Sequence, residues 1–516
     1  MSLIPLMVAL PLLAGFILPL LPRRWGRVAD VLAVAMAAAL VILSLAALGL
    51  SDTVYTMGAW KPPIGINLVL DGASRLMLLV ITVITLAVVL YCPPYMDRFT
   101  SKHRFYALFF LMVAGMNGVV LTGDMFNLFV FLEIASIASY ALVAFGCERD
   151  ELEASFRYLV LGTLASYMLL LGVVLLYAKL GTVNMAHLST KIAEAGGLAP
   201  RQPLTALFAF ATVLFICGLG LKAALVPFHA WLPDAHPSAP TPISAMLSGL
   251  LIKAIGVYAL IRVLFSVIGM TPILSDVLMT LGALSMVIGV LLAVGQWDFK
   301  RLLAYHSISQ IGYVVLGIGL ATPLGVAAGL FHLLNHAVFK SLLFLNAGAV
   351  EYRTGTRQLD EMGGLNKRMP VTGATSFVAS MSIAGVPPFN GFFSKLLIII
   401  ACFQAGRWGF AVAAVVVSIL TLASFMKVQK YAFFGRLGQK WQAVREAPGP
   451  MVASMVLLAV LCLASSALML DLMTAEKMDQ SFLGRAQQSL VRKTYVETVS
   501  KAGAAGTALA PTQKVE

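Results

Sequence analysis

Residues 218–262, GLGLKAALVPFHAWLPDAHPSAPTPISAMLSGLLIKAIGVYALIR, place two lysines in sequence that is otherwise apolar enough to span a membrane. Lys222 lies near the end of one apolar segment, and Lys253 lies near the middle of the next. A lysine at membrane depth costs about 2.5–3.5 kcal/mol even on a lenient insertion scale. Prolines at positions 227, 233, 237 and 240 break the helix between them, which lipid-exposed backbone does not tolerate. This segment must therefore face protein or water, and it predicts an ion pathway.

The composition of the whole chain is that of a multi-pass membrane protein. Of 516 residues, 60% are hydrophobic and only 11% are charged, which excludes a soluble globule. Apolar runs of about 20 residues predict about fourteen spans and leave no room for a soluble domain between them. The predicted spans are centred near residues 12, 39, 83, 114, 135, 166, 214, 253, 284, 310, 335, 388, 418 and 461.

The net charge of +13 reports membrane topology rather than a nucleic-acid partner. Arginines and lysines gather after predicted spans one, three, eleven and thirteen, and they are scarcer in the opposite loops. Because cytoplasmic loops carry the excess of positive charge, the N-terminus is expected outside. An even number of spans returns the C-terminus to the same outer face. We expect a multi-pass protein of a bacterial or archaeal cytoplasmic membrane, surrounded by the lipid bilayer.

No cofactor or metal is expected from the sequence. The five cysteines stand singly without a CxxC pair, which argues against a metal or disulfide framework. Haem, flavin, quinone and nucleotide motifs are absent, so any redox chemistry would belong to partner subunits. The chain shows neither a paired nucleophile and base nor a metal ligand set, which argues against an intramembrane hydrolase. We therefore expect no catalytic site within this chain.

The predicted fifth span, GDMFNLFVFLEIASIASYALVAFG (residues 123–146), carries Glu133 near its middle. Ser136, Ser139 and Tyr140 follow at helical spacing and form one polar stripe with it. A protonated glutamate that hydrogen-bonds a neighbouring helix is the structural alternative. An acid inside the membrane is nevertheless a functional hypothesis by default, and lysine partners are available. Such a pair can exchange a proton, or separate when another charge arrives nearby.

The polar stripe of the fifth span recurs 173 positions later in the tenth. Glu133, Ser136 and Tyr140 correspond to His306, Ser309 and Tyr313, and the same offset relates Lys222 to Lys395. Spans four to eight and nine to thirteen are therefore predicted to be two five-helix repeats. Since each repeat has an odd number of spans, the two would be inverted. Broken helices at matching positions, here helices seven and twelve, are the best sequence pointer to a transporter's site.

The predicted eleventh span, GLFHLLNHAVFKSLLFLNAG (residues 329–348), carries His332, His336 and Lys340 at spacings of four. These side chains share one helical face. No HExxH pattern or third ligand accompanies the two histidines, which argues against a metal site. Histidines beside a lysine favour a hydrated proton relay, because the ordinary histidine pKa is near neutral. Helix-packing hydrogen bonds remain the structural alternative for either histidine alone.

Two charged loops on the predicted cytoplasmic side are assigned mainly structural roles. HAWLPDAHP (residues 229–237) offers His229, Asp234 and His236 in a proline-rich turn, where helix capping and loop ordering are favoured over metal binding. Asp298, Lys300 and Arg301 are expected to be solvated charges at the membrane interface. His229, Asp234 and His306 are kept as secondary candidates for the proton route.

These observations divide the chain into five parts. We expect peripheral transmembrane helices one to three in residues 1–100, the first repeat in 101–266, the second repeat in 267–430 and helix fourteen in 431–472. Residues 473–516 form the C-terminal tail. The tail is weakly amphipathic and then rich in Ala, Gly and Thr, so we expect a surface helix, able to contact a partner subunit, followed by disorder.

Five motifs in order resemble the antiporter-like subunits of respiratory complex I, Mrp-type multisubunit cation/proton antiporters and membrane-bound hydrogenases. They are GDMFNLFVFLEIASIASYALV, the stretch from Lys222 to Lys253, DFKRLLAYHSISQIGY, FHLLNHAVFKSLLFL and GVPPFNGFFSK. The resemblance covers residues 101–430. The motifs are most similar to the D-type subunit of Mrp antiporters and its hydrogenase counterparts.

The resemblance implies an all-α polytopic fold of fourteen transmembrane helices with two inverted five-helix repeats and broken helices seven and twelve. It also implies that Glu133 and Lys222 form an ion pair, that Lys253 links the two halves, and that His332 and His336 continue the axis. Lys395 matches the terminal residue on helix twelve, which is Glu in some members. Lysine there argues against the type of complex I subunit that carries Glu.

The sequence therefore predicts a proton-translocating subunit that works with other integral membrane subunits through a Lys/Glu/His relay at the membrane midplane. Na⁺/H⁺ antiport and redox-driven pumping both stay open for the parent complex, as does passage of Na⁺ through this subunit. The alternative is a stand-alone carrier of a small solute. A carrier needs a compact pocket, whereas these titratable residues are spread singly over many spans, which suits a relay.

Overall fold

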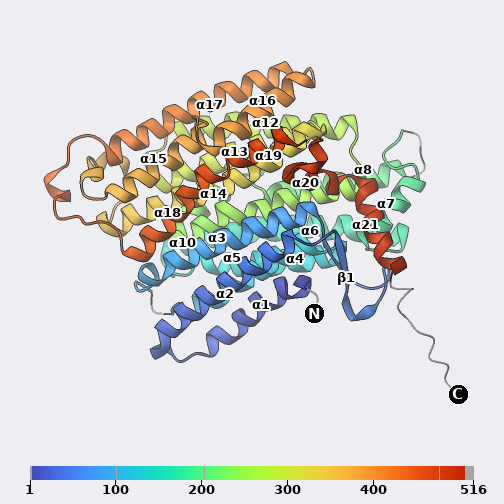
Figure 1. Cartoon of the computed structure of the whole chain (residues 1–516), viewed down its shortest axis with the longest axis horizontal. Helices are drawn as coiled ribbons and strands as arrows, with labels where there is room; N and C mark the ends of the chain where they lie inside the picture. The colour runs from blue at the N-terminus through green and yellow to red at the C-terminus, as the bar shows by residue number, and fades with distance from the viewer. Residues whose placement is uncertain (1–2, 100, 201, 203, 476, 506–516) are drawn as a thin grey trace.

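The computed structural model describes residues 3–99, 101–200, 202, 204–475 and 477–505, and within them the chain is almost entirely helical (Figure 1). One short hairpin pairs β1 (Thr53–Thr56) antiparallel with β2 (Asn67–Leu70). The first half contains α1 (Leu3–Ile17), η1 (Leu18–Leu20), η2 (Arg23–Trp25), α2 (Gly26–Leu48), η3 (Met57–Ala59), α3 (Gly72–Met96), α4 (Lys102–Leu121), α5 (Met125–Val143), α6 (Arg149–Leu180), α7 (Met185–Glu194), α8 (Thr205–Lys222), α9 (Leu232–Ser238), α10 (Thr241–Met246), η4 (Leu247–Tyr258), α11 (Ala259–Ile261) and η5 (Arg262–Ile268). The second half contains α12 (Pro272–Val294), α13 (Phe299–Gly319), α14 (Pro323–Thr354), η6 (Leu359–Glu361), η7 (Leu365–Lys367), α15 (Pro370–Ala384), α16 (Asn390–Gln404), α17 (Trp408–Val428), η8 (Gln429–Phe433), η9 (Gln439–Trp441), α18 (Gly449–Ala464), α19 (Ala467–Thr474), η10 (Met478–Gln480), α20 (Phe482–Leu490) and α21 (Arg492–Ala505).

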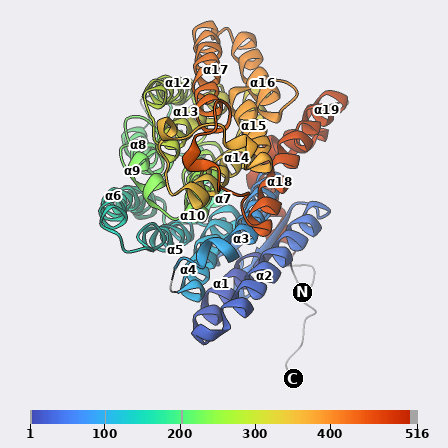
Figure 2. The same ribbon diagram turned by 90° about the vertical axis from the view of Figure 1, so that its left-hand side faces the viewer.

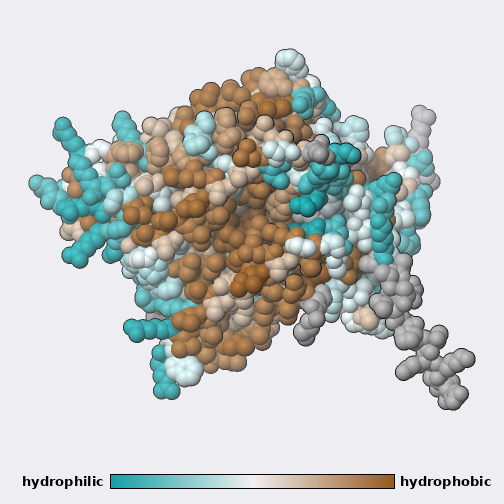
Figure 3. All heavy atoms as spheres, in the orientation of Figure 1, coloured by the Kyte–Doolittle hydropathy of each residue, from teal (hydrophilic) through white to brown (hydrophobic). Residues whose placement is uncertain are grey.

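The predicted all-α polytopic fold is confirmed. Among the described residues, thirteen helices are long and apolar enough to cross a membrane. The remaining predicted span, centred near residue 388, is divided between α15 and α16, each 15 residues long. Hydrophobic residues form a broad belt on the surface, and hydrophilic residues gather at the two ends of the helices (Figure 3). The belt has the character expected of a lipid-facing surface.

The bundle is layered around α14. This helix lies in the middle, with α1 and α2 at one edge and α16 and α17 at the other (Figure 2). The most apolar stretch of α14 is entirely buried, as is nearly all of α13 and of the helix from Thr241 to Ile268. These three segments carry most of the polar residues predicted to act. A helix that is surrounded by protein can hold polar groups that a lipid-facing helix cannot.

The helix that carries Lys222 ends at that residue. Nine residues without regular helical structure follow, and the chain resumes in the short helix α9. Residues 385–389 form the second predicted break, between α15 and α16. Lys253 lies in a different kind of irregularity, because η4 is a π-helical stretch of 12 residues. Such stretches are frequent at functional sites.

Two local structures recur almost at the predicted offset. An antiparallel bridge joins Asp124 to Asn184, and another joins Asp298 to Gln358, which is 174 positions later at both ends. Each aspartate also caps the helix that follows it, because its side chain accepts a hydrogen bond from the backbone N–H of Asn127 in α5 or of Arg301 in α13. The backbone bonds of the two bridges also match, at 2.8 Å from Met125 N to Val183 O and 2.9 Å from Phe299 N to Arg357 O.

The part of the C-terminal tail that the structure describes is mostly helical. Helices α20 and α21 fold back over the bundle (Figure 1), and Leu483, Leu490 and Tyr495 are buried. The hydroxyl of Ser489 accepts a hydrogen bond from Ala73 N at 2.9 Å. These buried side chains of the tail thus pack on the chain itself. The disorder expected at the end of the tail concerns residues 506–516, which lie outside the described residues.

Two loop predictions are wrong because long-range partners draw the side chains inward. Lys300, expected to be solvated, is buried, and its Nζ lies 2.8 Å from Glu351 Oε2. His236, expected in a surface turn, is completely buried. Asp298 agrees only in part with the expected solvated charge, because it caps α13 and pairs with Arg357 at 3.1 Å.

Candidate functional site

The first cluster of predicted residues forms where α5, α6 and α8 meet. Lys222 is buried, and its Nζ lies 3.6 Å from Glu133 Oε1. The same amine donates hydrogen bonds to Ser136 Oγ at 2.9 Å and to Tyr140 OH at 3.2 Å. Ser166 of α6, a residue that the sequence patterns did not single out, donates to the Glu133 carboxylate. The ion pair that the resemblance implied is therefore present, together with the hydroxyls of the polar stripe.

A glycine one turn before each broken-helix lysine permits a close backbone approach. A Cβ on Gly218 would lie 2.7 Å from Ala165 O, so α8 packs directly on α6 at that point. A Cβ on Gly391 would overlap Ser382 O, which leaves no room for any side chain. The two glycines are 173 positions apart, as are Lys222 and Lys395. Each lysine is thus positioned through the close packing of its glycine neighbour.

The second broken helix surrounds its lysine differently. Lys395 Nζ donates to Ile383 O at 2.7 Å and to Ser418 Oγ at 3.3 Å. It also lies 4.7 Å from the ring centroid of Tyr313, which matches Tyr140 in the first cluster. His306, at the position that matches Glu133, pairs through Nε2 with Ser424 Oγ at 2.8 Å. Within the described residues, no hydrogen bond or ion pair joins His306 to Lys395.

Lys253 lies in the interior of the bundle, on a stretch that contacts both α8 and α14. It is completely buried, and its Nζ donates to the carbonyl of Ser248 one turn earlier. The hydroxyls of Ser248 and Ser307 lie 2.6 Å apart, so this turn of η4 is tied to α13. A π-helical turn leaves local carbonyls displaced from their usual partners. A lysine in such a turn can use one of these carbonyls instead of a counter-ion.

The structure places His332, His336 and Lys340 on one face of α14, as predicted. All three are completely buried. His332 binds Ser394 Oγ through Nδ1 at 2.9 Å and Gln310 Oε1 through Nε2 at 3.2 Å, and its ring centroid lies 6.3 Å from that of His336. Since Ser394 precedes Lys395, His332 connects α14 to the second broken helix.

Several of these buried polar atoms have no hydrogen-bond partner in the part of the chain that the structure describes. Among the described residues, both ring nitrogens of His336 and the amine of Lys340 make no hydrogen bond. About nine-tenths or more of buried polar groups in proteins are hydrogen-bonded, and ordered water supplies the bonds that protein groups do not. The cluster therefore has the polar groups that internal water requires.

The predicted site residues reach the outer surface of the bundle at two places. The side chain of Glu133 is 24% exposed on α5, beside the exposed apolar residues Phe126 and Ile137. Lys395 and Ser418 line an apolar surface pocket of about 230 Å³ between α16 and α17. A partly exposed carboxylate on a lipid-facing belt is costly. A neighbouring subunit that covers α5 would remove this cost.

The secondary candidates in the loop after α8 have separate environments. Asp234 does not cap α9, because its carboxylate pairs with Arg157 at 2.9 Å and with Arg301 at 3.9 Å. His229 is half-buried, and burial lowers its pKa. The structure does not bring either residue into contact with the buried lysines. Within the described residues, no group of three or more His, Cys, Asp or Glu side chains is placed to hold a metal ion.

A buried ion pair that the sequence did not suggest joins the tail to the bundle. Arg262 Nη2 lies 2.8 Å from Asp71 Oδ2 and donates to Tyr258 OH at 2.7 Å. The guanidinium carbon lies 5.0 Å from the ring centroid of Tyr495 in α21. Arg262 Nη1 also donates to Ser489 O at 3.4 Å. This cluster is separate from the relay residues and holds α20 and α21 in place.

Comparison with known proteins gives consistent matches over most of the chain. Residues 122–421 match a family model described as NADH:quinone oxidoreductase/Mrp antiporter, transmembrane, and residues 60–106 match one described as the N-terminus of chain 5 of NADH-ubiquinone oxidoreductase (complex I). The N-type subunit of the NADH-quinone oxidoreductase of Desulforudis audaxviator is 39% identical over 416 residues, which are 78% of this chain and 81% of the relative.

Two further similarities concern antiporters. The D-type subunit of the Na⁺/H⁺ antiporter of Alkalihalophilus pseudofirmus is 36% identical over 450 residues, which cover 87% of this chain and 88% of that protein. A chain in the structure of the Mrp complex from a Dietzia species superposes with a TM-score of 0.85 and 33% identity. The superposition covers 96% of this chain and 98% of the other.

Proposed function

Since this chain belongs to the NADH:quinone oxidoreductase/Mrp antiporter family of membrane subunits, we propose that it translocates protons as one integral subunit of a multisubunit complex. The complex would lie in a bacterial or archaeal cytoplasmic membrane. The observation that carries the proposal is the pair of Lys222 and Glu133, with 3.6 Å between the amine and the carboxylate inside the bundle. Ion pairs at membrane depth mark ion pathways and proton relays.

The proton route that we propose uses Glu133, Lys222, Lys253, His332, His336, Lys340 and Lys395, with His306 beside it. Within the described residues, Glu133 is the one acid that pairs with any of the four lysines. The other three lysines are buried without a counter-ion in the described part of the chain, so water or neutral groups must share their protons. The hydrogen bond from His332 to Ser394 and the unpartnered atoms of His336 and Lys340 support a hydrated connection from α14 to Lys395.

A neighbouring subunit could control proton transfer in this chain through the exposed side of the Glu133 carboxylate. Because this carboxylate reaches the surface of α5, a charge on a neighbouring subunit could attract it away from Lys222. Lys222 would then hold its proton less firmly and pass it on. The same face gives a place for another membrane subunit, as in the multisubunit complexes that contain the relatives.

We also propose that residues 101–266 and 267–430 are inverted repeats, flanked by helices one to three, helix fourteen and the tail. The twin bridges at Asp124 and Asp298 support this proposal. Five spans separate the two bridges in sequence, so they would lie at opposite faces of the membrane. The bias of positive charge supports an orientation with the Asp298 bridge in the cytoplasm and both termini outside.

The relatives include subunits of both quinone oxidoreductases and Na⁺/H⁺ antiporters, and both kinds of complex can use the same proton route. A stand-alone carrier of a small solute has less support, because the polar residues extend over many helices instead of enclosing one pocket. Purification in mild detergent separates these proposals. The subunit hypothesis expects other integral membrane proteins in fixed proportion, whereas a free monomer that moves a solute would favour the carrier.

The direct test replaces Lys222 by alanine in the assembled complex. We expect proton translocation to fall by about tenfold or more, as for loss of a proton-transferring group. Lys179→Ala is the matched control, because Lys179 is an exposed lysine at the end of the neighbouring helix α6. Undiminished translocation in the Lys222→Ala complex, at normal assembly, would contradict the proposed function.

A further inference from the structure

A large apolar groove lies between α8 and α12 at the surface of the bundle. Its volume is about 1150 Å³, which exceeds the range of about 300–1,000 Å³ that is usual for small-molecule pockets. Apolar residues of the two helices form its walls, among them Val213, Ile216, Ile273 and Val277. Since Val213 and Ile273 are strongly exposed, the groove opens onto the apolar surface that faces lipid.

The two ends of the groove differ in character. At one end Pro227 and Phe228 of the first helix break form the floor, and Val226 N donates to Ser285 Oγ of α12 at 3.0 Å. At the other end lie the loops after α7 and before α12, together with Arg492 of α21. Figure 1 shows α7 and α21 at one end of the bundle, beside the hairpin. The groove therefore runs from one membrane surface toward the middle of the membrane.

Arg492 is the one charged side chain among the residues that line the groove. It is half-buried, its Nε donates to Ser189 Oγ at 2.7 Å, and its Nη2 donates to Ser189 O. A guanidinium carries five N–H donors and these bonds use two, so the described residues leave three unused. Gly269, whose φ is +90°, leaves space for the group, because a Cβ there would lie 3.1 Å from Nη1. Burial lowers the pKa of Arg492, and no acid of the described chain offsets this effect.

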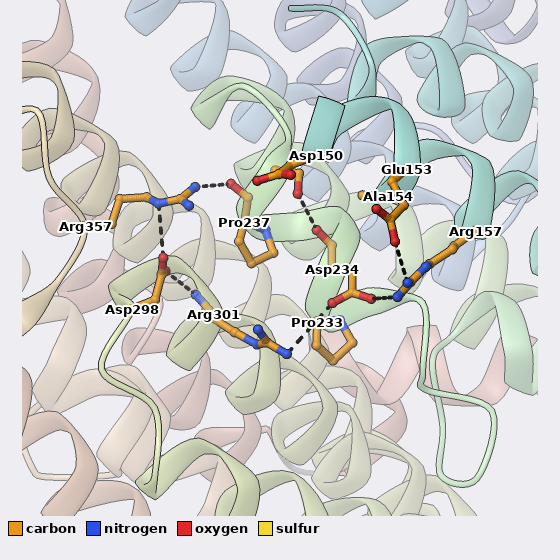
Figure 4. Close-up of a pocket in the computed structure, with 11 residues that line it drawn as sticks. Asp150, Glu153, Ala154, Arg157, Pro233, Asp234, Pro237, Asp298, Arg301 and Arg357 are labelled. Carbon is orange, nitrogen blue, oxygen red and sulfur yellow. Dashed lines mark hydrogen bonds and ion pairs between the residues drawn. The ribbon is translucent and has the colours of Figure 1, made fainter. Parts of the chain in front are cut away.

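The arginines of another pocket, where α6, α9 and α13 begin, have carboxylate partners (Figure 4). Arg157 pairs with Asp234 at 2.9 Å, and Arg357 pairs with Asp298 at 3.1 Å. Arg492 has no such partner within the described residues. Because a partly buried cation without a counter-charge is unfavourable, an anion in the groove would complete the site.

Two helices begin at the end of the groove where Arg492 lies. Ile273 and Leu274, in the first turn of α12, line the groove, and Arg492 is the first residue of α21. The N-terminus of a helix carries a partial positive charge that favours phosphate groups. No acidic residue lines the groove. One end of the groove is thus positive and the remainder is apolar, which complements a phosphate group that carries hydrocarbon chains.

We propose that this groove binds an anionic phospholipid, with its acyl chains between α8 and α12 and its phosphate on Arg492. Basic side chains at pockets between transmembrane helices recognise anionic headgroups in this way. A free phosphate would leave the apolar walls uncovered, and an apolar helix of another subunit would leave Arg492 without a counter-charge. The site goes beyond the proposed function and does not depend on the proton route.

The first test measures lipid selectivity in the assembled complex, purified in mild detergent and stripped of lipid. Binding of added phosphatidylglycerol, phosphatidylcholine or glycerol 3-phosphate is followed by native mass spectrometry. We expect phosphatidylglycerol to bind best and glycerol 3-phosphate not to bind. Arg492→Gln should weaken the binding of phosphatidylglycerol by about fivefold, the contribution of one basic side chain. Arg485→Gln is the matched control, because Arg485 is exposed on α20 of the same tail and does not line the groove.

The second test fills the groove itself. Ala209 is exposed on α8 and lines the groove, so Ala209→Trp should occupy the space of the acyl chains without disturbing the core. Ala206→Trp is its control, since Ala206 is also exposed on α8 but does not line the groove. We expect the Ala209→Trp complex to retain fewer anionic phospholipids than wild type after purification, and the Ala206→Trp complex to retain the same number.

Three results would overturn the inference. They are equal binding of phosphatidylglycerol and phosphatidylcholine to wild type, unchanged lipid retention in Ala209→Trp, and a helix of a partner subunit in the groove of the assembled complex. Should Arg492→Gln prevent assembly, the comparison of Ala209→Trp with Ala206→Trp decides. Loss or retention of proton translocation in Lys222→Ala bears on the proposed function alone, so the two failures are distinguishable.

Discussion

Replacement of Glu133 by glutamine should slow proton translocation strongly without preventing helix packing. The variant keeps the shape of the side chain and its hydrogen bond with Ser166, but it removes the charge that lies 3.6 Å from Lys222. Two unit charges about 4 Å apart interact by about 4 kcal/mol at an effective dielectric constant of about 20. Since the lysine is buried and Glu133 is only 24% exposed, solvent screens little of this coupling.

The assay is proton uptake by membrane vesicles that contain the assembled complex, followed with a pH-sensitive dye. A Na⁺ gradient drives an antiporter complex, and an electron donor drives a redox complex. We expect the Glu133→Gln rate to fall by about tenfold or more, and Glu133→Asp to lie between this variant and wild type because the charge remains at a longer distance.

A double-mutant cycle tests directly whether Glu133 and Lys222 act as a pair. If the two residues act as a pair, Glu133→Gln combined with Lys222→Met should be no worse than Lys222→Met alone, because residues in one ion pair do not contribute additively. Additive losses, or normal translocation in the Glu133→Gln complex, would refute the role of the pair. The yield of assembled complex is the control for folding.

Three further substitutions test other parts of the account. Lys395→Arg retains a positive charge but not a releasable proton, so we expect normal assembly with translocation lost; a normal rate would remove Lys395 from the relay. Arg262→Ala leaves Asp71 buried without its partner and should destabilise the protein by about 3–5 kcal/mol, seen as a lower melting temperature, whereas Arg75→Ala, at a pair whose Asp52 is exposed, should cost about 0–1 kcal/mol. Gly391→Ala forces a Cβ into Ser382 O, and it should lower both thermal stability and translocation, unlike Gly409→Ala, where the space is open.

The sequence predicts the membrane fold well because hydrophobicity over about 20 residues is a local property. Charges that interrupt such runs are equally visible, and the structure brings Lys222 to Glu133 and aligns His332, His336 and Lys340 on one face. The breaks follow from proline and glycine, which act on their own backbone. Most of these predictions depend on residues close together in the chain.

The predictions that fail concern residues whose contact partners lie far away in the chain. Lys300 looks like an interface charge until Glu351, on another helix, draws it inside. His236 looks like a turn residue, yet Phe344 and Trp231 enclose it. For the tail, the amphipathic pattern does not say what its apolar face covers, and the contacts with Ala73 and Arg262 show that it packs on the bundle. Hydropathy has no means of choosing such partners.

A structure of the complete complex that resolves ordered water is the most direct test of the proposed proton route. We predict water hydrogen-bonded to His336 and Lys340, and a continuous series of water and polar groups from Lys222 through Lys253 to Lys395. If apolar side chains instead pack dry around each of these residues and no water joins them in any functional state, protons do not move along this axis.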